Sequence, residues 1–222
     1  MPSRRTVIAT AGSLAVTSLA GCVDAVLGDG IEAKAEPAAV AEQTAAAAKF
    51  ERASIDSTVI ERQVEVAGSS RHFRATTWIT MYDKVVEDDS LVKEASKFVA
   101  VSTPGKSIAG QQLNPLVHLN NRELLERFSG RLGGGQLEDV KHQEDVTIDK
   151  WGTEMTVSSY DATFRRGGSA VEVTLYVGKV AHESDVILPI GIHHRQVDEA
   201  ENIYDMIRGL EHPVEAKTTG SQ

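Results

Sequence analysis

Residues 170–180 read AVEVTLYVGKV, a run in which apolar and polar side chains alternate. In an extended chain successive side chains point to opposite sides, so one face of this run is continuously apolar. That face consists of Val171, Val173, Leu175 and Val177. The run therefore predicts a β-strand that covers a core with one face. The turn-forming residues Arg165-Arg166-Gly167-Gly168 before it predict a partner strand over 153–164.

The same two-residue period recurs elsewhere in the chain. It predicts strands over 137–150 and 97–103, and a hairpin that runs from residue 58 through a turn at Gly68 to Met81. Residues 186–192 are almost continuously apolar, which is typical of a central strand buried on both faces. Pro189 argues against that central position, because proline has no N–H to donate to a neighbouring strand.

Three other segments have helical features. Pro37 opens an alanine-rich stretch over 38–50, which has high helix propensity. Asn120 and Glu123 have the spacing of a capping box at the start of a second helix. An apolar stripe predicts a last helix over 197–210.

These elements predict one domain over residues 37–212. We expect the α+β class, a mostly antiparallel sheet with helices packed on its faces in an α/β sandwich. The element order, with a strand that ends in Ser102-Thr103-Pro104-Gly105 and a last strand that leads into a C-terminal helix, loosely resembles the PsbP-like sandwich of photosynthetic accessory proteins. That resemblance implies a similar architecture and carries no function.

The first 22 residues have the features of an export signal. Arg4 and Arg5 precede an apolar run of roughly 14 residues, shorter than the about 20 that a membrane-spanning helix needs. The run ends in Leu19-Ala20-Gly21-Cys22. The two arginines resemble a twin-arginine signal, and the last four residues resemble a lipobox, whose cysteine is lipidated. We expect a signal peptide over 1–21, a lipid on Cys22, a flexible tether over 22–36 and a disordered tail over 213–222.

The charge balance is acidic, with 23 Lys and Arg against 32 Asp and Glu and a net charge of −9. Nucleic-acid binding needs a basic surface, so we expect no nucleic-acid partner. Acidic excess together with the export signal resembles the uncharacterised twin-arginine-exported lipoproteins of salt-loving archaea. The resemblance implies the twin-arginine export machinery as a partner. It also implies a location on the extracellular face of the cell membrane.

Candidate site residues are few. His182, His193 and His194 are the candidate metal ligands, but adjacent residues of a strand point to opposite faces, and hydrogen-bonded histidines at a strand end are the alternative. Trp78 and Tyr82 share a strand face and are candidates for a ligand cleft, with a place in the core as the alternative. We assign no metal, no cofactor and no catalytic residue.

Nucleophilic catalysis has no support in the residues. The only cysteine is Cys22, which the lipid would occupy, and no Gly-x-Ser-x-Gly motif is present. The sequence favours a non-enzymatic, membrane-anchored domain that binds a small ligand or a partner protein. The alternative is an extracytoplasmic hydrolase with Asp and His groups that the sequence does not place. An apolar cavity would favour ligand binding, and a pocket with converging titratable groups would favour the enzyme.

Overall fold

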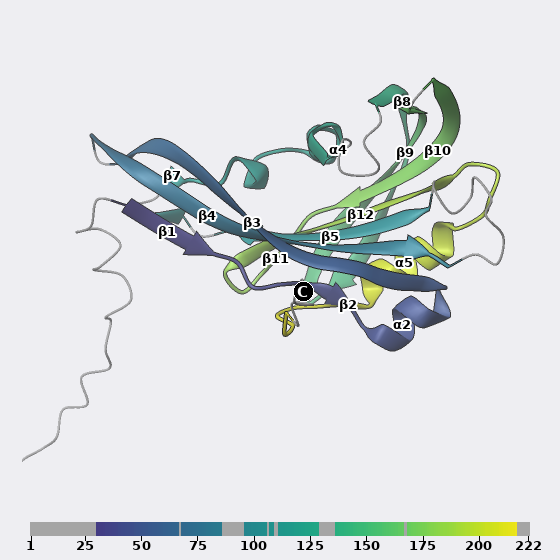
Figure 1. Ribbon diagram of the computed structural model, residues 1–222, viewed down its shortest axis with the longest axis horizontal. Coiled ribbons are helices and arrows are strands. Elements are labelled where there is room, and N and C mark those ends of the chain that lie inside the picture. The colour runs from purple at the N-terminus through teal and green to yellow at the C-terminus, as the bar shows by residue number, and fades with distance from the viewer. Residues whose placement is uncertain are drawn as a thin grey trace, which may run out of the picture.

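The computed structural model describes residues 30–66, 68–85, 96–105, 107–108, 111–128, 136–166 and 168–216 (Figure 1). The predicted signal peptide, with Arg4 and Arg5, lies outside the described residues, as does Cys22. Within the described residues, no helix is both long enough and apolar enough to cross a membrane.

Thirteen strands and four short helical segments make up the described part of the chain. The strands are β1 (Gly30–Lys34), β2 (Ala39–Val40), β3 (Phe50–Val66), β4 (Ser69–Lys84), β5 (Lys97–Pro104), β6 (Ser107–Ile108), β7 (Gln111–Gln112), β8 (Gln136–Lys150), β9 (Thr153–Arg166), β10 (Ser169–Gly178), β11 (Val180–His182), β12 (Asp185–His194) and β13 (Leu210–Glu211). The helices are α2 (Glu42–Ala47), α4 (Asn121–Phe128) and α5 (Ala200–Arg208), with a 3-10 turn, η1, at Pro115–Val117.

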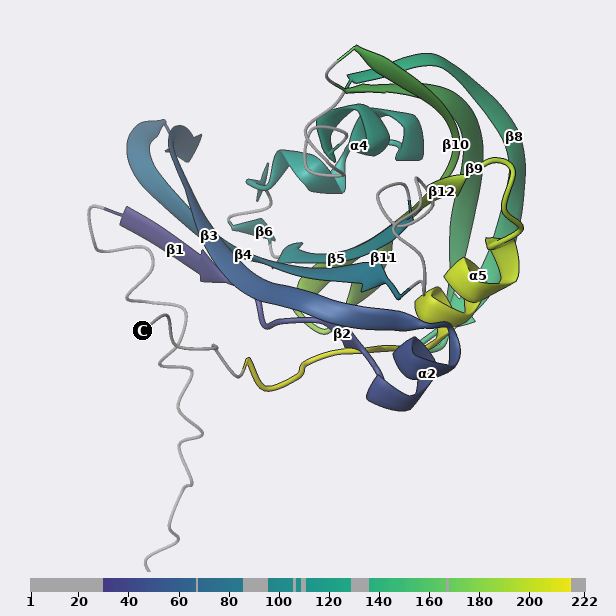
Figure 2. The same ribbon diagram turned by 45° about the vertical axis from the view of Figure 1, so that its right-hand side comes forward.

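One large sheet dominates the molecule. Its strands follow the order β1-β4-β5-β12-β10-β9-β8. Two further strands pair with members of this series, β3 with β4 and β11 with β12. The β1–β4 pair is parallel and the other pairs are antiparallel, so the sheet is mixed. Figure 2 shows that β8, β9 and β10 curl over α4, while α2 lies on the outer side of β3. The sheet is therefore a curved trough rather than a flat layer.

The expected α+β sandwich is wrong. The structure is mostly β, with 64% strand and 16% helix, and its described part has three short α-helices that do not form layers over the sheet. The alanine-rich stretch contributes only the six residues of α2, because β2 forms before it and β3 begins at Phe50. Residues 197–199 likewise precede α5 rather than belonging to it. Strand pairing of β2 and β3 thus overrides local helix propensity in the alanine-rich stretch.

The core lies on both faces of the central strands. Along β5, Phe98 and Ala100 pack in a cluster that includes α5, whereas Val99 and Val101 pack in a cluster that includes α4. Residues that alternate along one strand therefore supply both clusters, as expected for a strand covered on each face. Strand β12 is buried from Asp185 to His193 in the same way.

The predicted strands and the capping box are confirmed. Each predicted strand over 97–103, 137–150, 153–164 and 186–192 overlaps β5, β8, β9 or β12, and the hairpin corresponds to β3 and β4. Pro189 does lie in the central strand. It pairs with Ala100 of β5, but the pairing of β12 with β10 stops at Ile190 and that with β11 starts at Ile187, so Pro189 has no ladder partner on that side.

Parts of the predicted flexible tether and disordered tail are folded in the structure, at residues 30–36 and 213–216. Residues 30–34 form β1, in which Ile31 is 3% exposed, because an apolar side chain there packs on Phe73 and Ala75 of β4. At the other end, the Val214 N–H donates to the Pro37 carbonyl at 3.0 Å. The segments on both sides of the predicted domain thus belong to the folded unit, up to the limits of the described residues.

Candidate functional site

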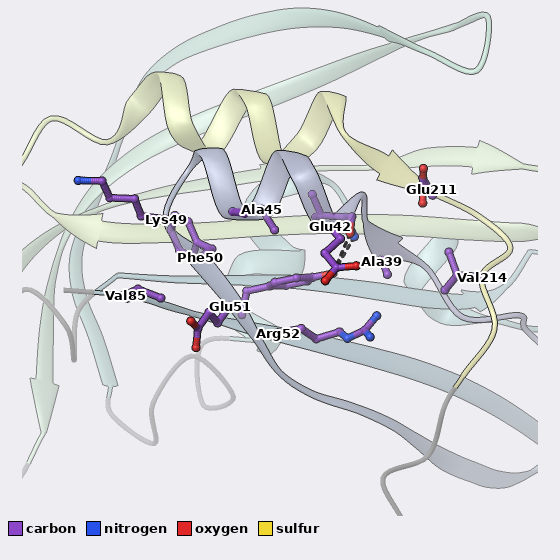
Figure 3. A pocket seen from close by; sticks show the side chains of 13 residues that line it. Ala39, Glu42, Ala45, Lys49, Phe50, Glu51, Arg52, Val85, Glu211 and Val214 are labelled. Carbon is purple, nitrogen blue, oxygen red and sulfur yellow. Dashed lines mark hydrogen bonds between the residues drawn. The ribbon is translucent and has the colours of Figure 1, made fainter. Parts of the chain in front are cut away.

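A cavity of about 740 Å³ opens between α2, β2, the start of β3 and the segment after β13 (Figure 3). The lining residues come from three separate stretches of the chain, 39–52, 82–85 and 211–214. They are Ala39, Val40, Glu42, Ala45, Ala46, Lys49, Phe50, Glu51, Arg52, Tyr82, Val85, Glu211 and Val214. This volume lies within the range of about 300–1,000 Å³ that is typical of small-molecule sites.

Two buried aromatic residues underlie the cavity. Phe50 is 2% exposed and Tyr82 is 1% exposed. The Val40 N–H donates to the Tyr82 phenol oxygen at 2.7 Å, and the phenol lies 3.4 Å from the Val40 carbonyl oxygen. Burial raises the pKa of the Tyr82 phenol, whereas its bond with the Val40 backbone and the nearby Arg52 guanidinium act in the opposite direction. The hydroxyl is thus committed to β2, and the aromatic rings form an apolar floor.

A β-bulge in β3 shapes the wall of the cavity at Arg52. The β3–β4 ladder is regular except between Arg52 and Ser54, where Ala53 is an extra residue. A bulge bends its strand and redirects a side chain, and bulges are common next to binding sites. Just before it, Lys49 has a positive φ of 56°, which turns the chain from α2 into β3. Lys49 and Arg52, the two basic residues of the lining, thus lie on either side of Phe50 and Glu51, where the chain enters β3.

The mouth of the cavity carries charges of both signs. Lys49 and Arg52 are exposed, as are the three carboxylates of the lining, Glu42, Glu51 and Glu211. None of these five groups is buried and aimed at a reacting centre. The arrangement therefore suits binding of a molecule with an apolar body and polar ends better than it suits acid–base catalysis.

The two predicted ligand-binding aromatics are separated by the structure. Tyr82 lies in the cavity floor, whereas Trp78 is outside the lining and donates its indole N–H to the Ala35 carbonyl at 3.0 Å. The sequence pattern gave no sign of Phe50 or Arg52. Arg52 occupies the cavity wall because of the bulge, and a bulge has no periodic signature.

A family model described as a domain of unknown function, DUF6517, matches residues 37–211. The chain belongs to the DUF6517 family. No curated protein and no solved structure matches it.

The three candidate metal-binding histidines of this DUF6517 domain do not meet. His182 lies beside Asp185 at one end of β12, and His193 and His194 lie at its other end. His193 contacts the Tyr176 phenol at 3.2 Å, and His194 Nδ1 accepts from the Gln196 N–H at 3.1 Å. No group of three or more potential ligands that could hold a metal was found in the described part of the chain.

A second, shallower hollow of about 390 Å³ lies between the start of α4 and strands β8 and β9 of the DUF6517 domain. His142 Nε2 is 2.9 Å from Asp145 Oδ1, and hydrogen bonds from Ser158 and His142 lower the pKa of the Asp145 carboxyl. In a serine hydrolase the imidazole stands between the hydroxyl and the carboxylate. Here the carboxylate stands between Ser158 and His142, so the imidazole is not placed to accept the hydroxyl proton. This hollow therefore supplies no hydrolase triad, and the hydrolase alternative stays a prediction.

Proposed function

We propose that this DUF6517 chain is a lipid-anchored, extracytoplasmic domain that binds a small amphipathic molecule in the cavity between α2 and β3. The cavity itself carries the proposal. It combines a ligand-sized volume, a floor of Phe50 and Tyr82, and a charged mouth.

The ligand has an apolar body with at least one anionic or strongly polar group. The apolar part lies over the aromatic floor and against Val85 and Val214. The polar group lies beside Arg52, whose planar guanidinium can donate two parallel hydrogen bonds to a carboxylate, sulfonate or phosphate. The glutamates at the mouth disfavour a ligand with several negative charges, because like charges repel.

The binding test uses 8-anilinonaphthalene-1-sulfonate, which has an apolar ring system and one sulfonate. Ala46 is an exposed residue of α2 that lines the cavity, so a tryptophan at this position would occupy part of the space for the probe. We therefore expect Ala46→Trp to weaken binding of the probe by at least about tenfold. Ala47→Trp is the matched control, since Ala47 is exposed on the same helix but does not line the cavity. Fluorescence titration measures both affinities. Equal affinities for the two variants would mean that the probe binds elsewhere and would remove the support for this site.

The location of the protein is proposed from the N-terminal residues. Arg4 and Arg5 resemble a twin-arginine signal, and Cys22 stands where a lipobox cysteine is lipidated. A two-chain lipid anchors firmly, because each buried methylene contributes about 0.8 kcal/mol. We expect Cys22→Ser to leave the protein unprocessed or released from the membrane. Cell fractionation tests this, and a variant that stays in the membrane with its signal removed would contradict lipid anchoring.

Native mass spectrometry identifies the natural ligand. The mature protein is purified in high salt from its own membranes, so that its mass reports both the group on Cys22 and any bound molecule. A retained small molecule supports the proposal and gives the ligand class. A retained protein and no small molecule would favour a partner-binding domain instead.

A further inference from the structure

A chain of four side chains connects the end of the β11–β12 hairpin to the segment after β13. His212 Nε2 lies 3.1 Å from Asp185 Oδ2, and His212 Nδ1 lies 3.0 Å from His182 Nδ1. The His182 ring stacks on Trp151 with a centroid distance of 4.2 Å. The side chains of Asp185 and His212 are each 1% exposed, whereas His182 is half-buried. The chain thus runs from a buried carboxylate toward the surface.

The facing Nδ1 atoms of His182 and His212 can hold only one proton between them while they are hydrogen-bonded. The Asp185 carboxylate only accepts, so His212 donates its Nε2–H to it. With the pair holding one shared proton, His182 donates Nδ1–H and His212 Nδ1 accepts, or the reverse. If both rings were doubly protonated, each Nδ1 would carry a proton, so two N–H groups and two positive rings would face each other across 3.0 Å. Full protonation of the pair is therefore incompatible with this contact.

The contact holds one wall of the cavity. His212 lies between Glu211 and Val214, both of which line the cavity, and the rest of the wall is attached by few backbone bonds. These include the pairing of β13 with β2, the Ala41 N–H to the Gly209 carbonyl at 2.9 Å, and the Val214 N–H to the Pro37 carbonyl. Asp185 Oδ2 also accepts from the Glu36 N–H at 2.8 Å. One carboxylate therefore fastens the chain both before β2 and after β13.

The charged groups around the pair come from several elements. Among the described residues, Asp185 on β12 is the carboxylate that contacts the pair. Lys150 of β8 lies over the Trp151 ring at 4.8 Å and interacts with Glu211 of β13. Glu183 follows His182 in the hairpin turn and is exposed, as is the side chain of Glu36. Apart from Asp185, no described carboxylate contacts either ring to offset a second positive charge.

We propose that the His182–His212 pair is an acid-sensitive latch on the cavity wall, which holds the segment after β13 in place while the pair shares one proton and releases it when both rings are protonated. The latch itself is independent of any ligand. The consequence that acid releases a bound molecule rests on the proposed function.

Amide hydrogen exchange tests the latch on the full chain. The reporters are the Ala41 and Val214 amides in the wall, and the Leu124 amide in α4, which donates to the Asn120 carbonyl, is the internal reference. After correction for the intrinsic effect of pH, we expect the protection of the two wall amides to fall by at least about tenfold between pH 7.5 and pH 5, with the reference unchanged. Protection that is equal at both pH values would overturn the latch.

Two variants separate the pair from other histidines. His182→Phe keeps a ring against Trp151 but can neither hydrogen-bond to His212 nor take up a proton, so the protection of the wall amides should no longer depend on pH. His142→Gln removes an exposed histidine that has its own carboxylate partner, and acid opening should persist. Acid opening that persists unchanged in a folded His182→Phe variant would contradict the proposal. Should that variant fail to fold, nitrogen NMR of the wild-type histidines decides, since two doubly protonated rings with protected wall amides would overturn the latch.

The same pH series with the sulfonate probe separates the two proposals. Wall opening with loss of probe binding supports both. Wall opening while the probe stays bound in wild type supports the latch and contradicts the placing of the ligand against this wall.

Discussion

Lys84 and Glu199 carry opposite charges in the interior, where their side chains are 5% and 8% exposed. Lys84 Nζ donates to Glu199 Oε2 at 2.5 Å and to the Ala48 carbonyl at 3.0 Å. Removing one member of a buried pair leaves the other charge without compensation, which costs about 3–5 kcal/mol. We expect Lys84→Met to lower the free energy of unfolding by this amount in urea denaturation at pH 7.

Lys97 provides the control for this prediction. It forms a pair of the same length with Asp83, also at 2.5 Å, but the two side chains are 20% and 44% exposed. Exposed pairs contribute only about 0–1 kcal/mol, because water solvates the partner that is left. Lys97→Met should therefore cost far less than Lys84→Met. Similar losses for the two variants would show that burial does not set the cost.

Ionisation of the Tyr204 phenol should lower the free energy of unfolding at alkaline pH. Burial, followed by the nearby Glu144 carboxylate, raises the pKa of the Tyr204 phenol to about 12. Because the folded state holds the proton more tightly than the unfolded chain, this contribution is complete below about pH 10 and is lost as the pH rises from 10 to 12. Unfolding free energies of Tyr204→Phe should fall less steeply over that interval than those of the wild type. Parallel curves would contradict the assignment.

At the scale of elements, strands were predictable and helix lengths were not. A two-residue period is a property of one strand and its two faces, so it identified β8, β9, β10 and the β3–β4 hairpin. The capping box of α4 is equally local: Asn120 Oδ1 accepts from the Glu123 N–H at 3.0 Å, and Glu123 Oε2 accepts from the Asn120 N–H at 2.8 Å. The alanine-rich stretch is shortened by partners distant in sequence, since β2 pairs with β13 and β3 with β4.

Close packing of α5 on β12 gives a prediction at this scale. A Cβ added at Gly191 would lie 2.6 Å from Ile203 Cγ2, a branched side chain fixed in the core. Overpacking of this kind costs about 1–3 kcal/mol. We expect Gly191→Ala to lower the free energy of unfolding by that amount. Gly178→Ala should cost less, because its closest neighbour is the thioether sulfur of Met155 at 2.9 Å, which can move.

For the whole molecule, the folded unit begins before the family match at residue 37. Strand β1 pairs with β4, Ala35 is 3% exposed, and its carbonyl accepts from Trp78. A chain that starts at residue 37 should have a free energy of unfolding at least about 2 kcal/mol lower than a chain that starts at residue 30. The reason is the loss of buried apolar side chains such as that of Ile31. Thermal unfolding of the two chains measures this. Equal midpoints would mean that β1 does not contribute to stability.

The sequence by itself determined most strands and the capping box, because each depends on residues that are neighbours along the chain. It also predicts a lipid on Cys22, which lies outside the described residues. Only the tertiary structure decided the strand order, the curvature of the sheet and the predominance of strand over helix. It alone brought Phe50 and Tyr82 together under a cavity, and His182 within reach of His212, 30 residues away. The physical reason is that periodicity records which way a side chain points within its own element. Contacts between distant segments are set by how the elements pack, and no local pattern records them.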